Sequence, residues 1–516
     1  MTTPSIRRLS AVVAIAATAL PVGQAAAMSA RSQQEYIVMM RPGSTHARGR
    51  AAIATVGGRV TRQVPMVRGY GARLTATGAA RLRHMRGVYA VVKNTRVSSV
   101  DSVESTGPGD TTATSYNQSV GSDGLWISPW LATGRGVTVA VIDTGIAGDV
   151  VDFRRSPVDP ASRVVATVVT NPDATTATDR YGHGTHVAGL IAGNGYDRPV
   201  TDPLFGKYIG AAPEADLVSV KASDDHGNAT VLDVINGLQF VVDHKADYKI
   251  RVVNLSLESS APQSARIDPL DAAVEQAWLH GLVVVAAAGN RGSSSDAVTY
   301  APGNDPYAIS VGGVDDKSTK ATIDDELATW SSRGVTQDGY RKPEVIAPGA
   351  HMVSVLAPGS DFATLCNSCV VGGSYIRLGG TSMSAAVASG VVADLLQAHP
   401  AWTPDQVKAA LVGTTRNVRN VGPEIAALAA MKADLTKLPK ANLGLVPNSL
   451  INPATGNIDW LRASWSRASW STASDPLRAS WSRASWSCSC LVQSTTTMTT
   501  SRASWSRASW SSNWDK

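Results

Sequence analysis

Four apolar runs recur through the middle of the chain. They are GVTVAVID, ADLVSVKA, IRVVNLSL and LVVVAAAGN, at residues 136–143, 215–222, 250–257 and 282–290. Each run is apolar at most positions instead of at every second one, which is typical of strands buried on both faces of a sheet. Segments 230–243 and 269–280, which lie between runs, have helical composition. This alternation predicts an α/β fold with a mostly parallel central sheet between two layers of helices.

Two further helices are predicted after these runs. TSMSAAVASGVVADLLQAHP, beginning at Thr381, carries few charges and suits a helix buried through the middle of the molecule. The next helix has Thr403 as its N-cap, Pro404 in its first turn and Gln406 completing a capping box.

The region before these runs has a different pattern. Strand-like runs, EYIVMM and VYAVVKN, stand near the two ends of residues 36–100, and the Arg-rich middle is predicted to be more helical. This predicts a small α+β module. The polar, turn-rich stretch from 106 to 120 then predicts a linker.

The first 27 residues have the pattern of a secretory signal. Arg7 and Arg8 precede an apolar stretch, LSAVVAIAATAL, and Ala25 to Ala27 form a small-residue cleavage site. The stretch is too short to span a bilayer, and no later segment reaches about 18 uninterrupted apolar residues. We therefore expect a secreted, extracellular protein that does not span a membrane.

The end of the chain is repetitive. RASWS occurs six times, beginning at Arg462, Arg467, Arg478, Arg483, Arg502 and Arg507. With a five-residue spacing, paired tryptophans do not share one face of a strand, and they do not share one face of a helix. The pattern predicts a low-complexity tail without a packed core.

Charge divides the chain into unlike parts. Residues 28–105 carry a net +10, residues 106–458 a net −10, and residues 459–516 a net +4. The sequence pI is about 9.1, but the largest globular part is acidic, which argues against nucleic acid as a partner.

The four cysteines lie in the motifs CNSC (Cys366, Cys369) and CSC (Cys488, Cys490). Export favours disulfides over zinc. The pairing stays open, because bonds within each motif close very small loops and bonds between the motifs tie the tail to the body.

Three polar groups flanked by small residues stand at predicted element ends. Asp143 ends a strand, His183 and His186 lie in GHGTHVAG, and Ser382 starts the buried helix. Nucleophilic acyl transfer needs a hydroxyl activated by an imidazole, and the imidazole needs a carboxylate to fix its tautomer. Ser382, His183 and Asp143 fill these roles.

An oxyanion site is predicted beside the hydroxyl. The backbone N–H of Ser382 lies at a helix start, and Gly379 and Gly380 allow close approach of a substrate. Asn290, just past a strand, supplies the second donor.

Other chemistries fit the motifs less well. A zinc site of the H-E-x-x-H kind wants a glutamate where Gly184 stands. An aspartic protease needs a second motif like Asp143-Thr144-Gly145, and the sequence contains none. A dinucleotide site needs its glycines after a strand, but GRGVTVAVID has them before one. Sedolisin-type proteases use a glutamate as the base in place of histidine, so the motif HGTH argues against them.

The motifs DTG, HGTHVAG, AAGN and GTSMS, in this order, resemble those of the subtilisin-like serine proteases (subtilases, peptidase family S8) over residues 122–415. The resemblance implies a subtilisin-like three-layer fold and a serine endopeptidase acting on proteins or peptides. It implies Asp143 as the orienting acid, His183 as the base, Ser382 as the nucleophile and Asn290 as the oxyanion donor. It also implies that no cofactor is required, with structural calcium as the one addition the family allows. His186 is expected to be a structural neighbour that hydrogen-bonds within the fold.

The N-terminal module resembles the inhibitor-like prosegment of the same proteases. The expected division of the chain is a signal peptide (1–27), an inhibitor-like propeptide (28–105), a peptidase domain (106–425), a linker (426–458) and the RASWS tail (459–516). Such a propeptide is an intramolecular inhibitor, and we expect it to be removed by self-cleavage between about residues 100 and 122.

Two positions depart from the family pattern. Ala386 stands where a proline usually follows the nucleophile, which suggests a straighter helix. Glu258 replaces the usual glycine in the wall of the primary specificity pocket, and Arg291 lies near the same pocket by resemblance. The two either pair with each other or leave Glu258 to attract a basic substrate side chain. The expected substrate-binding residues are Ser256, Leu257, Glu258 and Gly289.

The tail allows a rival function. Serine-flanked tryptophans with regular arginines suit stacking on sugars at a cell wall, or they form a solvated repeat without a partner. The alternative for the whole chain is a catalytically silent subtilase-like protein that binds a cell surface through this tail.

Overall fold

The computed structural model describes residues 32–103 and 114–451. The predicted signal peptide (1–27), the RASWS tail (459–516) and the cysteines Cys488 and Cys490 lie outside these described residues.

The body is built on a ten-stranded sheet in the order β22-β23-β18-β14-β13-β11-β7-β9-β8, with β15 paired to β14. Neighbouring strands are parallel, except for β22 with β23 and β15 with β14. The strands are β7 (Thr138–Asp143), β8 (Val164–Val169), β9 (Asp216–Lys221), β11 (Ile250–Leu255), β13 (Val283–Ala287), β14 (Ile309–Asp315), β15 (Glu326–Leu327), β18 (Val345–Pro348), β22 (Arg416–Val418) and β23 (Gly422–Glu424). The predicted apolar runs contain β7, β9, β11 and β13. Every residue of β7 and β13 is buried, which explains why these runs do not alternate.

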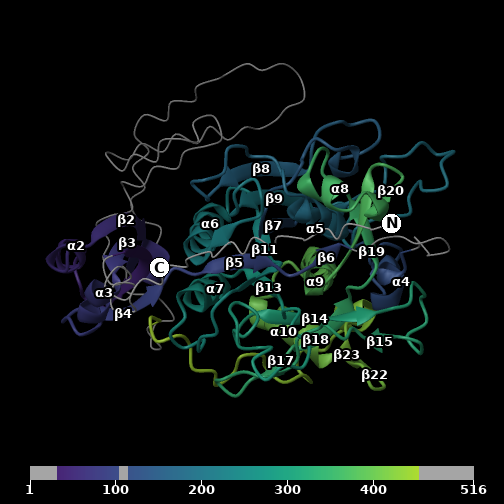
Figure 1. Cartoon of the computed structure of the whole chain (residues 1–516). Helices are drawn as coiled ribbons and strands as arrows, with labels where there is room; N and C mark the ends of the chain where they lie inside the picture. The colour runs from purple at the N-terminus through teal and green to yellow at the C-terminus, as the bar shows by residue number, and fades with distance from the viewer. Residues whose placement is uncertain (1–31, 104–113, 452–516) are drawn as a thin grey trace, which may run out of the picture.

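Helices cover both faces of this sheet, so the predicted three-layer α/β arrangement is confirmed (Figure 1). Helices α6 (Val231–His244) and α7 (Pro269–Leu279) pack together on one face. Helices α5 (His183–Ala192) and α9 (Thr381–Ala398) pack together on the other.

The two predicted C-terminal helices are present. Helix α9 is buried from Thr381 to Leu396, as its lack of charge predicts. Helix α10 (Pro404–Gly413) begins with the predicted capping box, in which the Gln406 N–H donates to Thr403 Oγ1 and the Thr403 N–H donates to Gln406 Oε1.

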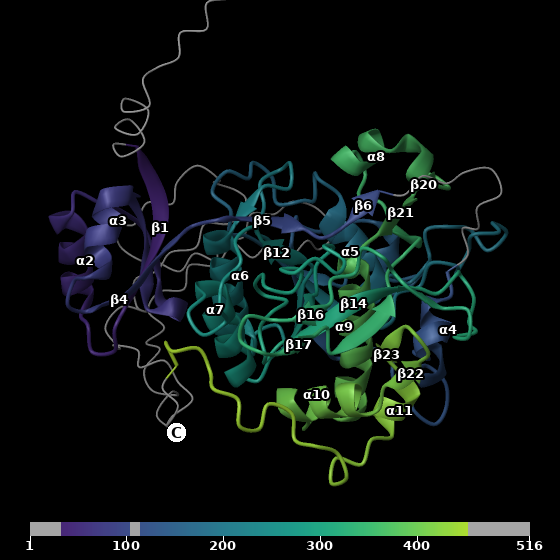
Figure 2. The ribbon, with the colours of Figure 1, turned by 60° about the horizontal axis from the view of Figure 1, so that its bottom comes forward.

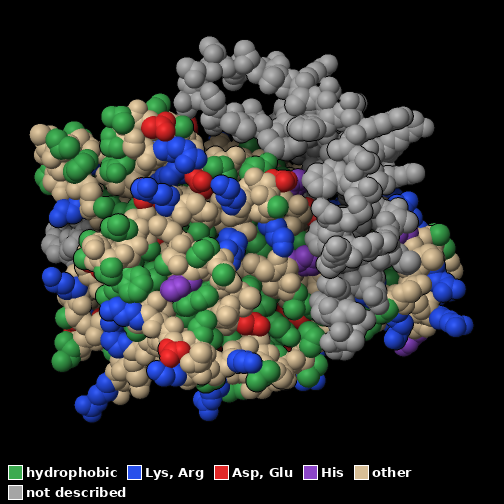
Figure 3. Space-filling view, turned by 180° about the vertical axis from the view of Figure 1, so that it is seen from behind, with side chains coloured by type: hydrophobic (Ala, Val, Ile, Leu, Met, Phe, Trp, Pro, Cys, Tyr) green, Lys and Arg blue, Asp and Glu red, His purple; other side chains and the backbone are tan. Residues whose placement is uncertain are grey.

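An N-terminal module (residues 33–93) has its own four-stranded antiparallel sheet, in the order β2-β3-β1-β4. Its elements are β1 (Gln33–Met40), α2 (His46–Thr55), β2 (Arg59–Val64), η1 (Pro65–Val67), β3 (Gly69–Thr75), α3 (Ala76–Arg83) and β4 (Val88–Lys93). A separate apolar core fills it, including Val38, Leu74 and Leu82, each 0% exposed. Blue Lys and Arg side chains lie along its visible edge in the view from behind, at the right of Figure 3.

The prediction for this module was partly wrong. The first and last strands were expected, but its middle contains β2 and β3 as well as the two helices. In β2 only Val64 is fully buried, and the strand reads RVTRQV. So few apolar positions hide a strand from an analysis of hydrophobic pattern.

From this module the chain crosses the body in two short strands (Figure 2). Strand β5 (Arg96–Ser99) pairs antiparallel with β10 (Ala229–Thr230) and with β12 (Leu257–Ser259). Strand β6 (Ser102–Val103) pairs antiparallel with β21 (Tyr375–Gly379). The N-terminal segment therefore completes sheets that belong to the body.

The remaining elements are short. They are α4 (Tyr116–Val120), η2 (Asp123–Leu125), η3 (Val151–Phe153), β16 (Gly334–Val335), β17 (Arg341–Lys342), β19 (Met352–Val355), α8 (Asp361–Leu365), η4 (Asn367–Cys369), β20 (Val370–Val371) and α11 (Ala427–Met431). Within the described ranges, no helix has both the length and the apolar character that crossing a membrane requires.

Candidate active site

The three candidate catalytic residues lie at the ends of elements on one edge of the sheet. Asp143 is the last residue of β7, His183 is the first residue of α5, and Ser382 is the second residue of α9. Their exposed fractions are 6%, 0% and 0%. Because the carboxyl ends of parallel strands and the helices that follow them meet at one edge, segments far apart in sequence converge there.

The carboxylate of Asp143 holds the imidazole of His183. Asp143 Oδ1 lies 2.7 Å from His183 Nδ1. The same oxygen accepts a hydrogen bond from the Thr144 N–H at 2.7 Å. Since Nδ1 faces a carboxylate, the neutral ring keeps its proton there and presents Nε2 as an acceptor. A general base needs this orientation.

The start of α5 is fixed by a tight approach and by a buried carboxylate. A Cβ on Gly184 would lie 2.2 Å from the carbonyl oxygen of Gly145, so the position requires glycine. Asp179 accepts hydrogen bonds from the Gly182 N–H at 2.7 Å and from the N–H and hydroxyl of Thr185 at 2.8 and 2.7 Å. The sequence analysis missed Asp179, although an acid just before a helix start was a signal that could have found it.

The surroundings of His183 favour its charged form. Complete burial lowers the pKa, but the carboxylates of Asp143 and Asp101 raise it more strongly, so that the pKa of His183 rises to about 9. Asp101 Oδ1 lies 3.9 Å from Nε2. The reactive nitrogen therefore faces a carboxylate of the segment that crosses the body between β5 and β6.

Ser382 contacts the residue before that aspartate. Its N–H donates to the carbonyl oxygen of Val100 at 3.3 Å, and its hydroxyl accepts from the Val100 N–H at 3.2 Å. The hydroxyl donates to the carbonyl oxygen of Ser256 at 3.1 Å. Among the described residues His183 Nε2 has no hydrogen-bond partner, so Ser382 and His183 do not bond to each other here. Ser382 thus contacts the backbone of Val100, and His183 faces the side chain of the next residue, Asp101.

Asn290 lies beside the same carbonyl group. Its Oδ1 accepts hydrogen bonds from the N–H and the hydroxyl of Thr381, each at 3.0 Å, which fixes the amide. A Cβ on Gly380 would lie 2.3 Å from the carbonyl oxygen of Val100 and 2.9 Å from Asn290 Nδ2. Both groups therefore border one small space, which a side chain at position 380 would fill.

The predicted substrate wall is occupied by β5. Leu257, Glu258 and Ser259 pair with Ser99, Ser98 and Val97, in antiparallel register. The Ser256 hydroxyl donates to the carbonyl oxygen of Ser382 at 2.9 Å, which links the wall to the start of α9.

Glu258 pairs with Arg291 in this structure, which is the first of the two expected alternatives. Glu258 Oε1 lies 2.8 Å from Arg291 Nη2, and the guanidinium of Arg291 stacks 3.8 Å from the centre of the Tyr300 ring. A Cβ on Gly289 would lie 2.7 Å from Glu258 Oε2, so this carboxylate fills the space in front of Gly289. Burial raises the pKa of Glu258, and Arg291 opposes that rise.

The model of the subtilase family matches residues 134–446, more than half of the chain. The chain belongs to the subtilase family. It is 36% identical over 307 residues to the serine protease AprX of Bacillus subtilis (strain 168), covering 58% of this chain and 66% of AprX, just under two thirds. It is 33% identical over 283 residues to a subtilisin from Bacillus pumilus, covering 55% of this chain and 84% of that protein. Fervidolysin from Fervidobacterium pennivorans, described as a keratinolytic enzyme related to subtilisin, is similar in structure with a TM-score of 0.59 and 23% identity, over 78% of this chain and 61% of fervidolysin. The subtilisin-like fold is thereby confirmed.

The second histidine of this subtilase has a structural place. His186 Nε2 lies 3.1 Å from the carbonyl oxygens of both Met352 and Ile376, as expected for a residue that hydrogen-bonds within the fold. Burial lowers the pKa of His186 to about 3, so the ring is neutral in the folded protein at ordinary pH. At the other departure from the family pattern, Ala386 is buried within α9, which continues unbroken through it.

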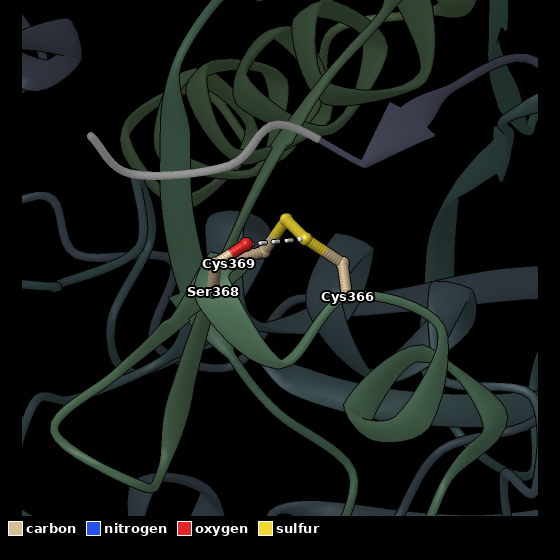
Figure 4. The surroundings of a disulfide bond; sticks show 3 residues. All are labelled: Cys366, Ser368 and Cys369. Carbon is tan, nitrogen blue, oxygen red and sulfur yellow. Dashed lines mark hydrogen bonds between the residues drawn. A yellow bond between two sulfur atoms is a disulfide. The ribbon is translucent and has the colours of Figure 1, made fainter.

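The cysteine pairing is settled for the first motif. Cys366 and Cys369 form a disulfide between α8 and η4, and Ser368 Oγ lies 3.5 Å from Cys366 Sγ (Figure 4). This small loop follows Phe362, whose ring centre lies 6.5 Å from that of His183.

The structural calcium that the family resemblance allows stays a prediction. No group of three or more His, Cys, Asp or Glu residues in the described ranges is arranged to hold a metal ion. No step below depends on a metal.

Proposed function

We propose that this protein is a serine endopeptidase that hydrolyses peptide bonds through Asp143, His183 and Ser382. The observation that carries the proposal is the position of the Val100–Asp101 peptide bond. Ser382 contacts both backbone groups of Val100, and His183 Nε2 lies 3.9 Å from the Asp101 carboxylate. A peptide substrate placed in the same way meets a hydroxyl, a base and two oxyanion donors.

The reaction begins when Ser382 Oγ attacks the carbonyl carbon. The hydroxyl leaves the carbonyl oxygen of Ser256, where it is 3.1 Å away, and gives its proton to His183 Nε2. Asp143 stabilises the imidazolium that forms. The Ser382 N–H and Asn290 Nδ2 receive the charge that develops on the carbonyl oxygen.

Collapse of this intermediate breaks the carbon–nitrogen bond. His183 gives its proton to the leaving nitrogen, and an acyl-enzyme ester remains on Ser382. Water, deprotonated by His183, then attacks the ester and frees the new carboxyl end.

The prosegment, residues 28–100, is the first substrate in this proposal. Its last strand, β5, is hydrogen-bonded on both sides, to β10 and β12. Residues 28–100 hold 13 basic residues and one acidic residue, and this net charge of +12 complements the acidic body. Cleavage after Val100 lies at the beginning of the interval expected from the sequence. The prosegment then remains in the cleft as an inhibitor until it dissociates.

Export and the tail extend the proposal beyond the described residues. The pattern of residues 1–27 supports secretion, which would place the enzyme among extracellular protein and peptide substrates. For residues 459–516, binding to a cell wall stays a prediction. Co-sedimentation of the full-length and tail-deleted proteins with cell-wall material tests it.

Self-cleavage of the full chain provides the main test. Purified wild-type protein is expected to yield a fragment whose N-terminal residue is Asp101, as read by N-terminal sequencing. Ser382→Ala is expected to remain uncut in a protease-free host. The matched control is Ser384→Ala, which removes a buried hydroxyl in the same turn of α9. This hydroxyl has no hydrogen-bond partner among the described residues. Ser384→Ala should still be cut.

A serine-directed organofluorophosphonate separates this proposal from the silent binding protein. The matured wild type should be labelled at Ser382, and Ser382→Ala should not be labelled. Absence of labelling in a folded, matured wild type would favour the binding protein.

A further inference from the structure

The last described residues return to the N-terminal module. After α11 the chain runs along the surface, with Leu443 78% exposed and Val446 57% exposed. It then becomes buried, with Asn448 at 0%, Leu450 at 1% and Ile451 at 4%. In both ribbon views the yellow end of the coloured chain reaches the module (Figures 1 and 2). Residues 448–451 are called the C-terminal clasp below.

One side of the clasp is bonded to the body. The Asn448 N–H donates to Glu275 Oε2 at 2.7 Å, and Asn448 Nδ2 donates to the carbonyl oxygens of Ala265 and Asp268 at 2.6 and 3.0 Å. The Ser449 N–H and hydroxyl both donate to one carbonyl oxygen, that of Arg266, at 3.0 and 2.6 Å. Buried, multiple hydrogen bonds of this kind fix the clasp in one position.

The other side of the clasp is bonded to the module. Arg68 Nη2 donates to the carbonyl oxygen of Leu450 at 3.0 Å. The hydroxyl groups of Tyr89 and Ser449 hydrogen-bond to each other. Arg68 caps the end of η1 and Tyr89 lies in β4, so the clasp contacts two separate parts of the module.

Apolar contacts continue across this junction. Leu450 belongs to the same continuous apolar core as Met66 and Val67 of η1, and η1 packs against α7 of the body. These residues are distinct from the module's own core. The clasp thus fills part of the surface on which the module rests.

We propose that the C-terminal clasp is a second docking surface for the cleaved prosegment, and that it slows the release of the prosegment from the mature enzyme. The proposal rests on the inhibitory role of the prosegment proposed above. After the cut at Val100–Asp101, three sets of contacts hold the prosegment. These are the pairing of β5, the contacts of the module with α6, including an Arg62–Asp233 ion pair at 2.7 Å, and the clasp. The C-terminal segment in this way sets how long inhibition lasts.

Release of the prosegment from the full chain tests this surface. The self-cleaved complex is diluted, and the lag before peptidase activity appears is measured together with the retention of the prosegment in gel filtration. Leu450→Ala removes apolar contact in the clasp and is expected to speed release about tenfold or more. Arg68→Ala removes the hydrogen bond from the other side and is expected to speed release about threefold to tenfold.

Two controls lie close to these positions in sequence. Leu443→Ala changes an exposed leucine in the same C-terminal segment, and Arg59→Ala changes an exposed arginine of β2. Neither should alter the lag. Arg68→Ala also keeps the test valid if Leu450→Ala lowers the yield of folded protein, because the mature enzyme that it releases has the wild-type sequence. For all four variants, kcat/KM after complete release should equal that of the wild type.

The outcomes separate the two proposals. Retention of the prosegment in the wild type, with release rates of Leu450→Ala and Arg68→Ala equal to those of the controls, overturns the clasp alone. A wild type that cuts itself but shows neither a lag nor a retained prosegment overturns the inhibitory function, and the clasp with it.

Discussion

Two carboxylate–cation pairs border the segment that crosses the body. Asp143 pairs with His183 at the end of β7, at 2.7 Å, and Glu258 pairs with Arg291 beside β12, at 2.8 Å. The distances are alike, but the cations are not. The His183 side chain is 0% exposed, and the Arg291 side chain is 34% exposed and stacked on Tyr300.

The difference shows what each region can do. The pKa of His183, at about 9, lies within a range where the ring can gain and lose a proton. A guanidinium is always charged in proteins, so a side chain of this kind cannot relay a proton. The Asp143–His183 pair at β7 can therefore transfer protons. The Glu258–Arg291 pair at β12 acts through the space that its side chains fill.

Asp143→Asn is expected to have the largest effect on this comparison. An amide at this position no longer stabilises the imidazolium and favours the wrong tautomer of His183, so self-cleavage should slow by about 10⁴-fold. The measurement is the rate of cleavage of the full chain, followed by gel electrophoresis. Asp149→Asn, in the exposed loop after β7, serves as the control and should cleave at the wild-type rate. Equal rates for the two variants would separate Asp143 from the chemistry.

Asp101→Asn is expected to change the pH dependence of self-cleavage. The Asp101 carboxylate favours the charged imidazolium of His183, and the base acts only when neutral, so wild-type cleavage should fall as the pH drops below about 9. Removal of this charge lowers the pKa of His183 and moves the fall to lower pH. A displacement of one pH unit corresponds to about tenfold faster cleavage at pH 7.

The conservative variant provides the control for this pH effect. Asp101→Glu keeps the negative charge and should keep the wild-type pH profile. The profile is measured as initial cleavage rates at constant ionic strength, over about five pH units from about pH 5 to about pH 10. Identical profiles for Asp101→Asn and the wild type would show that Asp101 does not control the charge of His183.

The sequence predicted the parts of the site that depend on local signals. Asp143, His183, Asn290 and Ser382 each stand where an apolar run ends or a helix begins, and the fold of an α/β sheet brings such positions to one edge. The same reasoning found the buried helix α9 and the capping box at Thr403.

The parts that were not predicted depend on contacts between distant segments. The place of Val100 beside Ser382 follows from the pairing of β5 with β12, about 160 positions later, and no local pattern encodes a register across that distance. The pairing of Glu258 with Arg291 depends on side-chain conformation, which the sequence left open. The burial of Leu450 depends on a surface assembled from the module and the body.

Glu258→Gly is expected to have the smallest effect, on selection of the substrate residue before the cut. Because Glu258 Oε2 lies 2.7 Å from the position of a Cβ on Gly289, the carboxylate occupies space that a large side chain would need. Val100, the residue before the proposed cut, is small and is only 3% exposed. Removal of the Glu258 side chain should raise kcat/KM for peptides with Phe or Leu at this position by about tenfold relative to Val.

Glu258→Gln distinguishes size from charge in this effect. Glutamine keeps the volume of the side chain and loses the charge that pairs with Arg291, so the preference for Val over Phe should persist if occupied space sets it. A panel of peptides with Val, Leu, Phe or Lys before the cut, hydrolysed by matured protein, gives the ratios. A higher kcat/KM for Lys peptides in the wild type, lost in Glu258→Gln, would mean that Glu258 separates from Arg291 and binds the basic side chain of the substrate. The region at β12 would then act through charge, and the contrast with Asp143 and His183 would narrow to proton transfer alone.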